Sequence, residues 1–205
     1  MNDKQITIGI PTYGTIKTKT FESIIKFVKS VPYNVPIISQ QGPYIQENRN
    51  TIVQRAKILG YEKILFVDHD MVFEPEAVQS LIGRDKDIVG APFAVKFLPT
   101  DPFYAVKKTD SLGANIWEEV EDGLFKCCGL GTALMLIKTS VFDKVPQPWF
   151  EIQYDPNGVM EWGEDLWFCK KARDVGFDIF CDTKSRVGHI GDFTYELPEG
   201  FNYKV

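Results

Sequence analysis

The chain has 205 residues, of which 44% are hydrophobic, and its formal net charge is −5 at pH 7. This length and apolar content are enough for one domain with a sizeable core. The acidic balance, without a long run of either sign, argues against a general nucleic-acid or membrane-surface partner. No apolar stretch approaches the roughly 20 residues that a membrane span needs.

The N-terminus and the cysteines indicate the compartment. Residues 1–5 lead straight into a predicted strand and have no signal-peptide pattern. The cysteines show neither a C-x-x-C pair nor the spacing of zinc ligands. We therefore expect a soluble, cytoplasmic protein with free, buried thiols. The cysteines are Cys127, Cys128, Cys169 and Cys181.

The first half of the chain alternates short apolar runs with helical patterns. Apolar residues recur at helical spacing from Phe21 to Val28. Gly60 suits the end of a second helix, and Pro75 suits the first turn of a third. This β-α-β order predicts a parallel sheet with helices on both faces. We expect strands at residues 5–10, 35–39, 63–67 and 87–90, and helices at residues 17–30, 45–59 and 74–82.

The second half of the chain changes character. Asp122-Gly123 is a hairpin signal between short strands that we expect to be partly antiparallel. These strands are predicted at residues 104–107, 116–120 and 124–126. Beyond them we expect a buried strand at 132–137, a short helix at 139–145, an aromatic-rich loop at 148–162 with a turn at 155–158, a helix at 164–175, a strand at 177–181 and a glycine-bounded element at 186–191.

Asp68-His69-Asp70 directly follows the apolar strand predicted at residues 63–67. In open α/β sheets, ligands bind at the carboxyl ends of the strands. Alternate residues of an extended chain point the same way, so Asp68 and Asp70 are candidate oxygen ligands for Mg²⁺ or Mn²⁺. An isolated D-x-D also fits a solvated acidic turn, and the triplet alone leaves both interpretations open.

Further runs accompany this triplet in order. Asn48-Arg49-Asn50, residues 63–75 and residues 87–90 resemble the nucleotide-sugar half of a GT-A glycosyltransferase of the family 2-like group. Runs in the second half resemble the acceptor half of the same enzymes, and they lie at residues 129–137, 162–169, 172–177 and 188–191.

The resemblance implies an α/β protein with the GT-A (Rossmann-like) fold. This fold is a three-layer α/β/α sandwich with a mainly parallel central sheet and a smaller antiparallel sheet on the acceptor side. The resemblance also implies one catalytic domain over residues 1–205, with the donor half at about 1–95 and the acceptor half at about 96–205.

The resemblance implies a metal site that binds the donor diphosphate. Asp70 is expected to be the main ligand, and Asp68 is expected to lie near the ribose or the metal. His69 is a sugar contact or a structural residue. His189, between two glycines, resembles the histidine that completes the site in many GT-A enzymes, although an isolated histidine is more often structural. Imidazole with carboxylate ligands favours Mn²⁺ over Mg²⁺.

Glu164-Asp165 opens a predicted helix behind Trp162-Gly163. Carboxylates at a helix start also complement the helix dipole, without any catalytic role. By resemblance, Asp165 is the general base that takes the proton of the acceptor hydroxyl, and Glu164 contacts the acceptor, with the two roles open to exchange. Trp162 and Gly163 are expected to bind the acceptor sugar.

Other residues are expected to bind the nucleotide-sugar. The resemblance places Pro11-Thr12-Tyr13, at the end of the first strand, against the nucleobase and ribose. Gln40 or Gln41 stands where the family often has an acid. Arg49 is a candidate contact to the base or the diphosphate, with a solvated helix face as the alternative. Lys96 is a candidate to neutralise phosphate, and Arg186 is the weakest candidate phosphate contact.

The implied function is transfer of a sugar from a nucleotide-diphosphate sugar, with UDP favoured over GDP, to a hydroxyl of a glycan or glycoprotein. A hexosyltransferase that inverts configuration in one displacement is expected. The alternatives are a retaining GT-A transferase, a nucleotidyltransferase and a binding module without turnover. The compact chain resembles enzymes of bacteria, bacteriophages and large DNA viruses, which places it in the cytoplasm, that of the host if viral. It also fits one domain of a longer protein.

Overall fold

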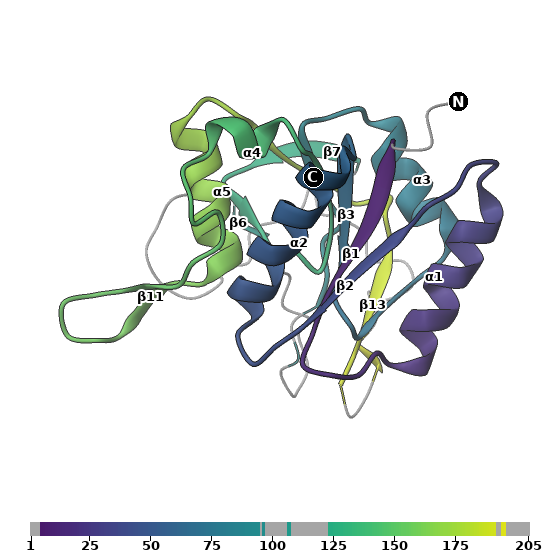
Figure 1. The fold of residues 1–205 in the computed structure, drawn as a ribbon, viewed down its shortest axis with the longest axis horizontal. Coiled ribbons are helices and arrows are strands. Elements are labelled where there is room, and N and C mark those ends of the chain that lie inside the picture. Colours follow the sequence, from purple (N-terminus) through teal and green to yellow (C-terminus); the bar gives the residue numbers. More distant parts are fainter. Residues whose placement is uncertain (1–4, 95, 97–105, 108–122, 192–193, 196–205) are drawn as a thin grey trace.

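The computed structural model describes residues 5–94, 96, 106–107, 123–191 and 194–195. A sheet forms the centre of the molecule (Figure 1). It has seven strands in the order β2-β1-β3-β9-β5-β12-β7. Its strands are β1 (Ile6–Thr12), β2 (Ile37–Gln41), β3 (Lys63–Val67), β5 (Ile88–Gly90), β7 (Leu124–Cys127), β9 (Leu134–Lys138) and β12 (Ile179–Asp182). The helices are α1 (Thr18–Ser30), α2 (Ile45–Leu59), α3 (Pro75–Gly83), α4 (Val141–Lys144) and α5 (Glu164–Asp174).

The central sheet is mainly parallel, as predicted. β2, β1, β3, β5 and β12 run in one direction, while β9 and β7 run against them. The strands at 63–67 and 87–90 follow one another in the predicted β-α-β order, but they are not neighbours in the sheet. Instead β9 lies between β3 and β5 and pairs antiparallel with both. β9 comes from the second half of the chain. Its pairing with β3 and β5 is therefore a long-range contact, which local sequence patterns do not predict.

Helices cover both faces of the sheet and bury two separate cores, which makes three layers. Alternate residues of β3 divide between the cores: Ile64 and Phe66 pack with α2, α4 and α5, while Leu65 and Val67 pack with α1 and α3. A strand that is buried on both faces reads as a continuous apolar run, which is why residues 63–67 were identifiable in the sequence.

Two helix ends follow their sequence signals. Gly60 ends α2 in the left-handed conformation (φ 77°), and its N–H is donated to the carbonyls at the end of the helix. Pro75 is the first residue of α3. The predicted turn at residues 155–158 also forms, because the Gly158 N–H is donated to the Asp155 carbonyl at 2.9 Å.

Smaller sheets lie beside the central one. β4 (Met71–Phe73), β13 (Val187–Ile190) and β14 (Thr194–Tyr195) form a three-stranded antiparallel sheet, and β6 (Val106–Lys107) pairs with β8 (Gly129–Leu130). β10 (Gln153–Tyr154) and β11 (Met160–Trp162) form a hairpin that projects from the body, where the sequence suggested only a loop (Figure 1). β4 and β14 were not predicted. The strand expected at 116–120 and the turn residue Asp122 lie outside the described residues.

The four cysteines are free, as predicted, and Cys127, Cys169 and Cys181 are buried while Cys128 is partly exposed. Burial raises the pKa of Cys169 to about 12 and that of Cys127 further, so both thiols stay protonated at neutral pH. Within the described part of the chain, no helix is long and apolar enough to cross a membrane.

Candidate functional site

The candidate site is built at the end of β3. The Asp68 N–H is donated to the Ala133 carbonyl at 2.9 Å, and the Met71 N–H to the Asp68 carbonyl at 3.3 Å. Asp68-His69-Asp70 therefore forms a turn between β3 and β4. β4 pairs with β13 so that Met71 lies opposite His189, and the Ile190 N–H is donated to the Asp70 carbonyl at 2.8 Å. This pairing brings His189 from the far end of the chain to the triplet.

Asp70 is buried among cationic and imidazole groups. Its carboxylate pairs with the ammonium of Lys96, and its Oδ1 lies 3.5 Å from His189 Nε2. Its Oδ2 lies 3.9 Å from His69 Nε2. Burial opposes ionisation, but the hydrogen bonds from His189 and Lys96 outweigh it and hold the pKa of Asp70 well below its ordinary value. Asp70 is thus an anion throughout the physiological range.

His189 is held in one tautomer. Its Nδ1 lies 2.9 Å from the Ala94 carbonyl oxygen, which can only accept, so Nδ1 carries the proton. The ring also packs edge-on against Phe93, with 5.4 Å between ring centroids. Nε2 is therefore the nitrogen that faces Asp70. A backbone carbonyl that orients the far nitrogen in this way is the usual support of a metal-binding histidine.

Asp68 does not join Asp70 and His189. Its Oδ1 and Oδ2 accept hydrogen bonds from Arg49 Nη2 at 2.9 and 3.2 Å. Within the described ranges, no three His, Cys, Asp or Glu residues gather into a group that could hold a metal. Of the three residues predicted as metal ligands, the structure brings together Asp70 and His189, and it directs Asp68 toward a different partner.

Arg49 joins the two ends of the predicted site. It lies in α2 with only 3% of its side chain exposed, and its Nη1 pairs with Glu164, the first residue of α5. Burial opposes its charge, but the carboxylates of Asp68 and Glu164 raise the pKa of Arg49 above its ordinary value. The triplet after β3 and the carboxylates of α5 therefore lie at the same edge of the sheet.

Asp165 follows Glu164 in α5 and is partly exposed. Its Oδ1 accepts the N–H of Leu166 at 2.7 Å, so it does satisfy one backbone donor of the first helical turn. Burial and the neighbouring charge of Glu164 raise the pKa of Asp165 to about 6, although Arg49 opposes the shift. A Cβ at Gly163 would lie 3.2 Å from Asp165 Oδ1, so the glycine leaves room for this carboxylate. Trp162 is buried, with 8% exposed.

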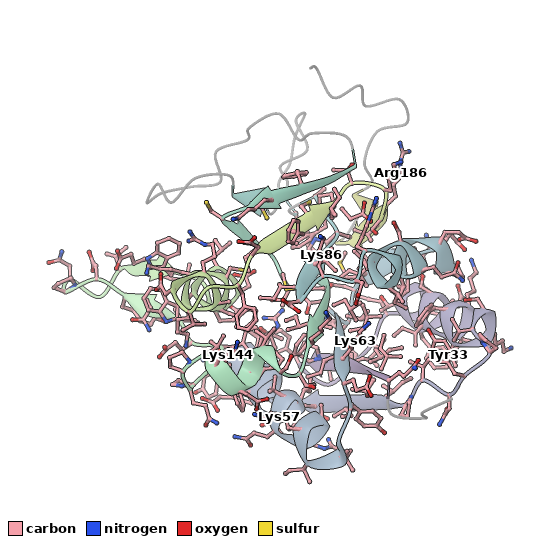
Figure 2. All side chains as sticks on the ribbon, turned by 90° about the horizontal axis from the view of Figure 1, so that it is seen from above. Tyr33, Lys57, Lys63, Lys86, Lys144 and Arg186 are labelled. Atoms are coloured by element: carbon pink, nitrogen blue, oxygen red, sulfur yellow. The ribbon has the colours of Figure 1, made fainter. Side chains whose placement is uncertain are left out.

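The residues predicted to bind the nucleobase lie at the ends of β1 and β2. Pro11 and Thr12 are buried, and Tyr13 is exposed and meets the His69 ring edge-on at 6.0 Å. Gln40 is partly exposed, and its Nε2 donates to the Gln41 carbonyl at 3.0 Å. Arg186, the weakest candidate in the sequence, points outward from the body (Figure 2).

Asn48 and Asn50 were not predicted as site residues, although they flank Arg49. Asn48 Nδ2 donates to the carbonyls of Thr12 and Gly42, at 3.2 and 3.0 Å. Asn50 exchanges two hydrogen bonds with the backbone of Phe150, at 2.8 and 3.0 Å. The available signal was the succession of three polar residues in an otherwise amphipathic helix. Successive residues of a helix point to different sides, so at least one of the three had to face the protein interior.

Comparison with known proteins supports the fold. No protein-family model matches the chain, and no curated protein matches it. The solved structure of A197 from STIV matches with a TM-score of 0.63 and 20% sequence identity, over 92% of this chain and 86% of that one. GalNAc-T7, solved with UDP, GalNAc and Mn²⁺, matches with a TM-score of 0.59 and 14% identity, over 93% of this chain.

The match covers 44% of the GalNAc-T7 chain, so this protein spans less than half the length of that structure. Both identities lie below 25%, and the likeness therefore shows the fold alone. With its seven-stranded central sheet between two helical layers and its small antiparallel sheet, the chain has the three-layer α/β/α architecture of GT-A-like proteins.

Proposed function

We propose that the protein is a metal-dependent glycosyltransferase. It moves a sugar from a nucleotide-diphosphate sugar, with UDP favoured over GDP, to a hydroxyl of a glycan or glycoprotein, with inversion at the anomeric carbon. One observation carries the proposal: Arg49 binds both Asp68 and Glu164, so the Asp68-His69-Asp70 triplet and the Glu164-Asp165 pair lie at one edge of the sheet. The sequence had placed them almost a hundred residues apart.

Asp70 and His189 are the proposed protein ligands of the metal. In the neutral ring with its proton on Nδ1, His189 Nε2 can bind a metal, and it lies 3.5 Å from Asp70 Oδ1. A bound metal would replace the hydrogen bond that His189 otherwise donates to Asp70. Diphosphate oxygens would complete the shell, and the group would then stabilise the charge that develops on the leaving phosphate.

The donor contacts follow from the same edge. Tyr13, Thr12, Pro11 and Gln40 are proposed to bind the base and ribose, and Asp68 the ribose or the water shell of the metal. Lys96, beside Asp70, is proposed to move onto the diphosphate when a donor binds. The UDP and Mn²⁺ that accompany GalNAc-T7 support a UDP-sugar and manganese here as well.

Asp165 is the proposed general base. The acceptor oxygen attacks the anomeric carbon as its proton passes to an Asp165 oxygen, and the bond to the donor diphosphate breaks. A carboxylate with a pKa of about 6 is better matched to this task at neutral pH than one with an ordinary value. Trp162, Gly163 and Glu164 are proposed to border the acceptor.

A donor panel tests the function. Purified protein is incubated with UDP- and GDP-sugars, with Mn²⁺, with Mg²⁺ or with a chelator, and released nucleotide is measured with and without glycan acceptors. We expect nucleotide diphosphate release that requires the divalent metal. Release of pyrophosphate would indicate a nucleotidyltransferase, and the absence of metal-dependent release with every donor would reject the transferase. The configuration of the product, read by NMR, separates inverting from retaining transfer.

A further inference from the structure

Arg49 holds one carboxylate of the Glu164-Asp165 pair and not the other. Its Nη1 pairs with Glu164, while its Nη2 is occupied by both oxygens of Asp68. Asp165 has no ion-pair partner in the described part of the chain. The sequence alone gives no reason to assign different roles to the adjacent carboxylates of Glu164 and Asp165. The buried guanidinium does, because it forms an ion pair with Glu164 and not with Asp165.

We propose that Arg49 is a positioning residue that fixes Glu164 in an ion pair and so leaves Asp165 as the carboxylate that takes the proton of the acceptor. The inference rests on the proposed function, since it names which member of the pair acts and what selects it. It also replaces the expectation that Arg49 contacts the donor.

The position of Arg49 argues against a donor contact. Both terminal nitrogens carry carboxylates, and the third nitrogen, Nε, is buried without a hydrogen-bond partner among the described residues. Only 3% of the Arg49 side chain is exposed, so the guanidinium offers little surface to a diphosphate while the two ion pairs stand. Arg49 acts through Asp68 and Glu164.

The charges around Asp165 explain the selection. Glu164 on its own helix and Asp68 beyond it disfavour the anion, Arg49 from α2 favours it, and the Leu166 N–H is donated to it. Cys169, one turn further along α5, is a protonated buried thiol. One guanidinium faces three carboxylates here and forms ion pairs with two of them, so the third, Asp165, is left without such a pair and its pKa is raised.

Arg49→Gln and Arg55→Gln are the matched variants that test the proposal. Arg55 lies in the same helix, but it is exposed and donates a hydrogen bond to the Ser39 carbonyl at 3.2 Å. The side-chain carboxyl of Asp165 is titrated by ¹³C NMR in each folded protein. Arg49→Gln is expected to raise the pKa of Asp165 by about one to three units, because an opposite charge at this range is removed. Arg55→Gln is expected to leave it unchanged.

Glu164→Gln is expected to shift the pKa of Asp165 in the opposite direction. Removal of this negative charge is expected to lower the pKa of Asp165 below its value of about 6. Loss of a buried charge between two carboxylates is destabilising, so Arg49→Lys replaces Arg49→Gln if the latter does not fold. The lysine keeps a positive charge, but its single ammonium does not span both partners. An unchanged Asp165 titration in the folded Arg49 variant overturns the proposal.

Transfer kinetics separate this inference from the function on which it rests. In Arg49→Gln, the acid limb of the pH profile of kcat/KM is expected to shift to higher pH by the same amount as the pKa that NMR reports for Asp165. In Arg55→Gln, this limb is expected to stay where it is. A weaker affinity for UDP and Mn²⁺ with an unmoved limb would make Arg49 a donor contact and overturn the proposal. An NMR shift in a protein that transfers no sugar would reject the transferase and leave the selection of Asp165 by Arg49 intact.

Discussion

Asp70 and Arg49 lie at the same edge of the sheet in opposite electrostatic settings. Around Asp70, one carboxylate is met by Lys96 and by two histidine rings, and its pKa is lowered. Around Arg49, one guanidinium is met by several carboxylates, and the pKa of Asp165 is raised. The first setting suits a fixed anion that attracts cations, and the second suits a group that exchanges a proton.

The largest effect is expected at the Asp70 end of this contrast. Asp70→Asn removes the negative charge of the proposed main metal ligand, so metal-dependent turnover should fall by about 100-fold or more. Nucleotide release at saturating Mn²⁺ measures the loss. Asp174→Asn, which breaks an exposed ion pair with Lys170 in α5, is the matched control and should keep full turnover. Undiminished turnover in Asp70→Asn would remove Asp70 from the site.

The Arg49 end should give a loss of a different kind. Asp165→Asn keeps the shape of the side chain but cannot accept a proton, so transfer should fall by about 10² to 10⁴-fold. Donor binding should be unchanged, because the proposed diphosphate site is the other cluster. Calorimetry with the donor and a transfer assay measure the two separately. Normal transfer by Asp165→Asn would contradict its role as the base.

The pH dependence of the unmodified protein sharpens the same contrast. Asp165 accepts a proton only when ionised, and its pKa is about 6. The value of kcat/KM should therefore fall about tenfold per unit as the pH drops below 6, while Asp70, with its lowered pKa, stays ionised. A profile that stays flat from pH 7 down to pH 5 would show that no group with this pKa limits the reaction.

The smallest effect is expected at Asn50, which lies next to Arg49 in α2 and binds the Phe150 backbone rather than either charged cluster. Asn50→Ala leaves the backbone N–H and carbonyl of Phe150 without their partners, which should lower the free energy of unfolding by about 1–3 kcal/mol. Denaturant unfolding measures this. Asn34→Ala, at an exposed position, should cost far less. Equal stability of the two variants would show that the Phe150 segment does not depend on α2.

Short-range sequence patterns predicted the helices and strands whose limits depend on neighbouring residues. The limits of α2 and β3 matched the sequence exactly in residue number, because amphipathic spacing, a capping glycine and a doubly buried apolar run are all short-range features. β4 was missed, since it is three residues long and its partner β13 lies over a hundred residues away. The same pairing brings His189 to Asp70, which resemblance alone had suggested.

The charge partners were beyond the reach of the sequence. An arginine in a polar stretch of a helix is most often solvated, and nothing local indicated that Arg49 would be buried between Asp68 and Glu164. The shared face expected for Asp68 and Asp70 assumed that the strand stays extended, whereas the chain turns after Val67. The partners of these side chains depend on how three distant segments meet.

The run Asn48-Arg49-Asn50 makes the helical register at the start of α2 critical. Each residue reaches a different segment: the β1 and β2 ends, the carboxylate pair, and the Phe150 backbone. One residue inserted into or deleted from the first turn of α2, ahead of Asn48, would rotate these side chains by about 100° about the helix axis and misdirect all three at once. Pro43 and Tyr44, just before the helix, are exposed, so their side chains are replaceable. At the start of α2, the protein tolerates a change of residue far better than a change in the number of residues.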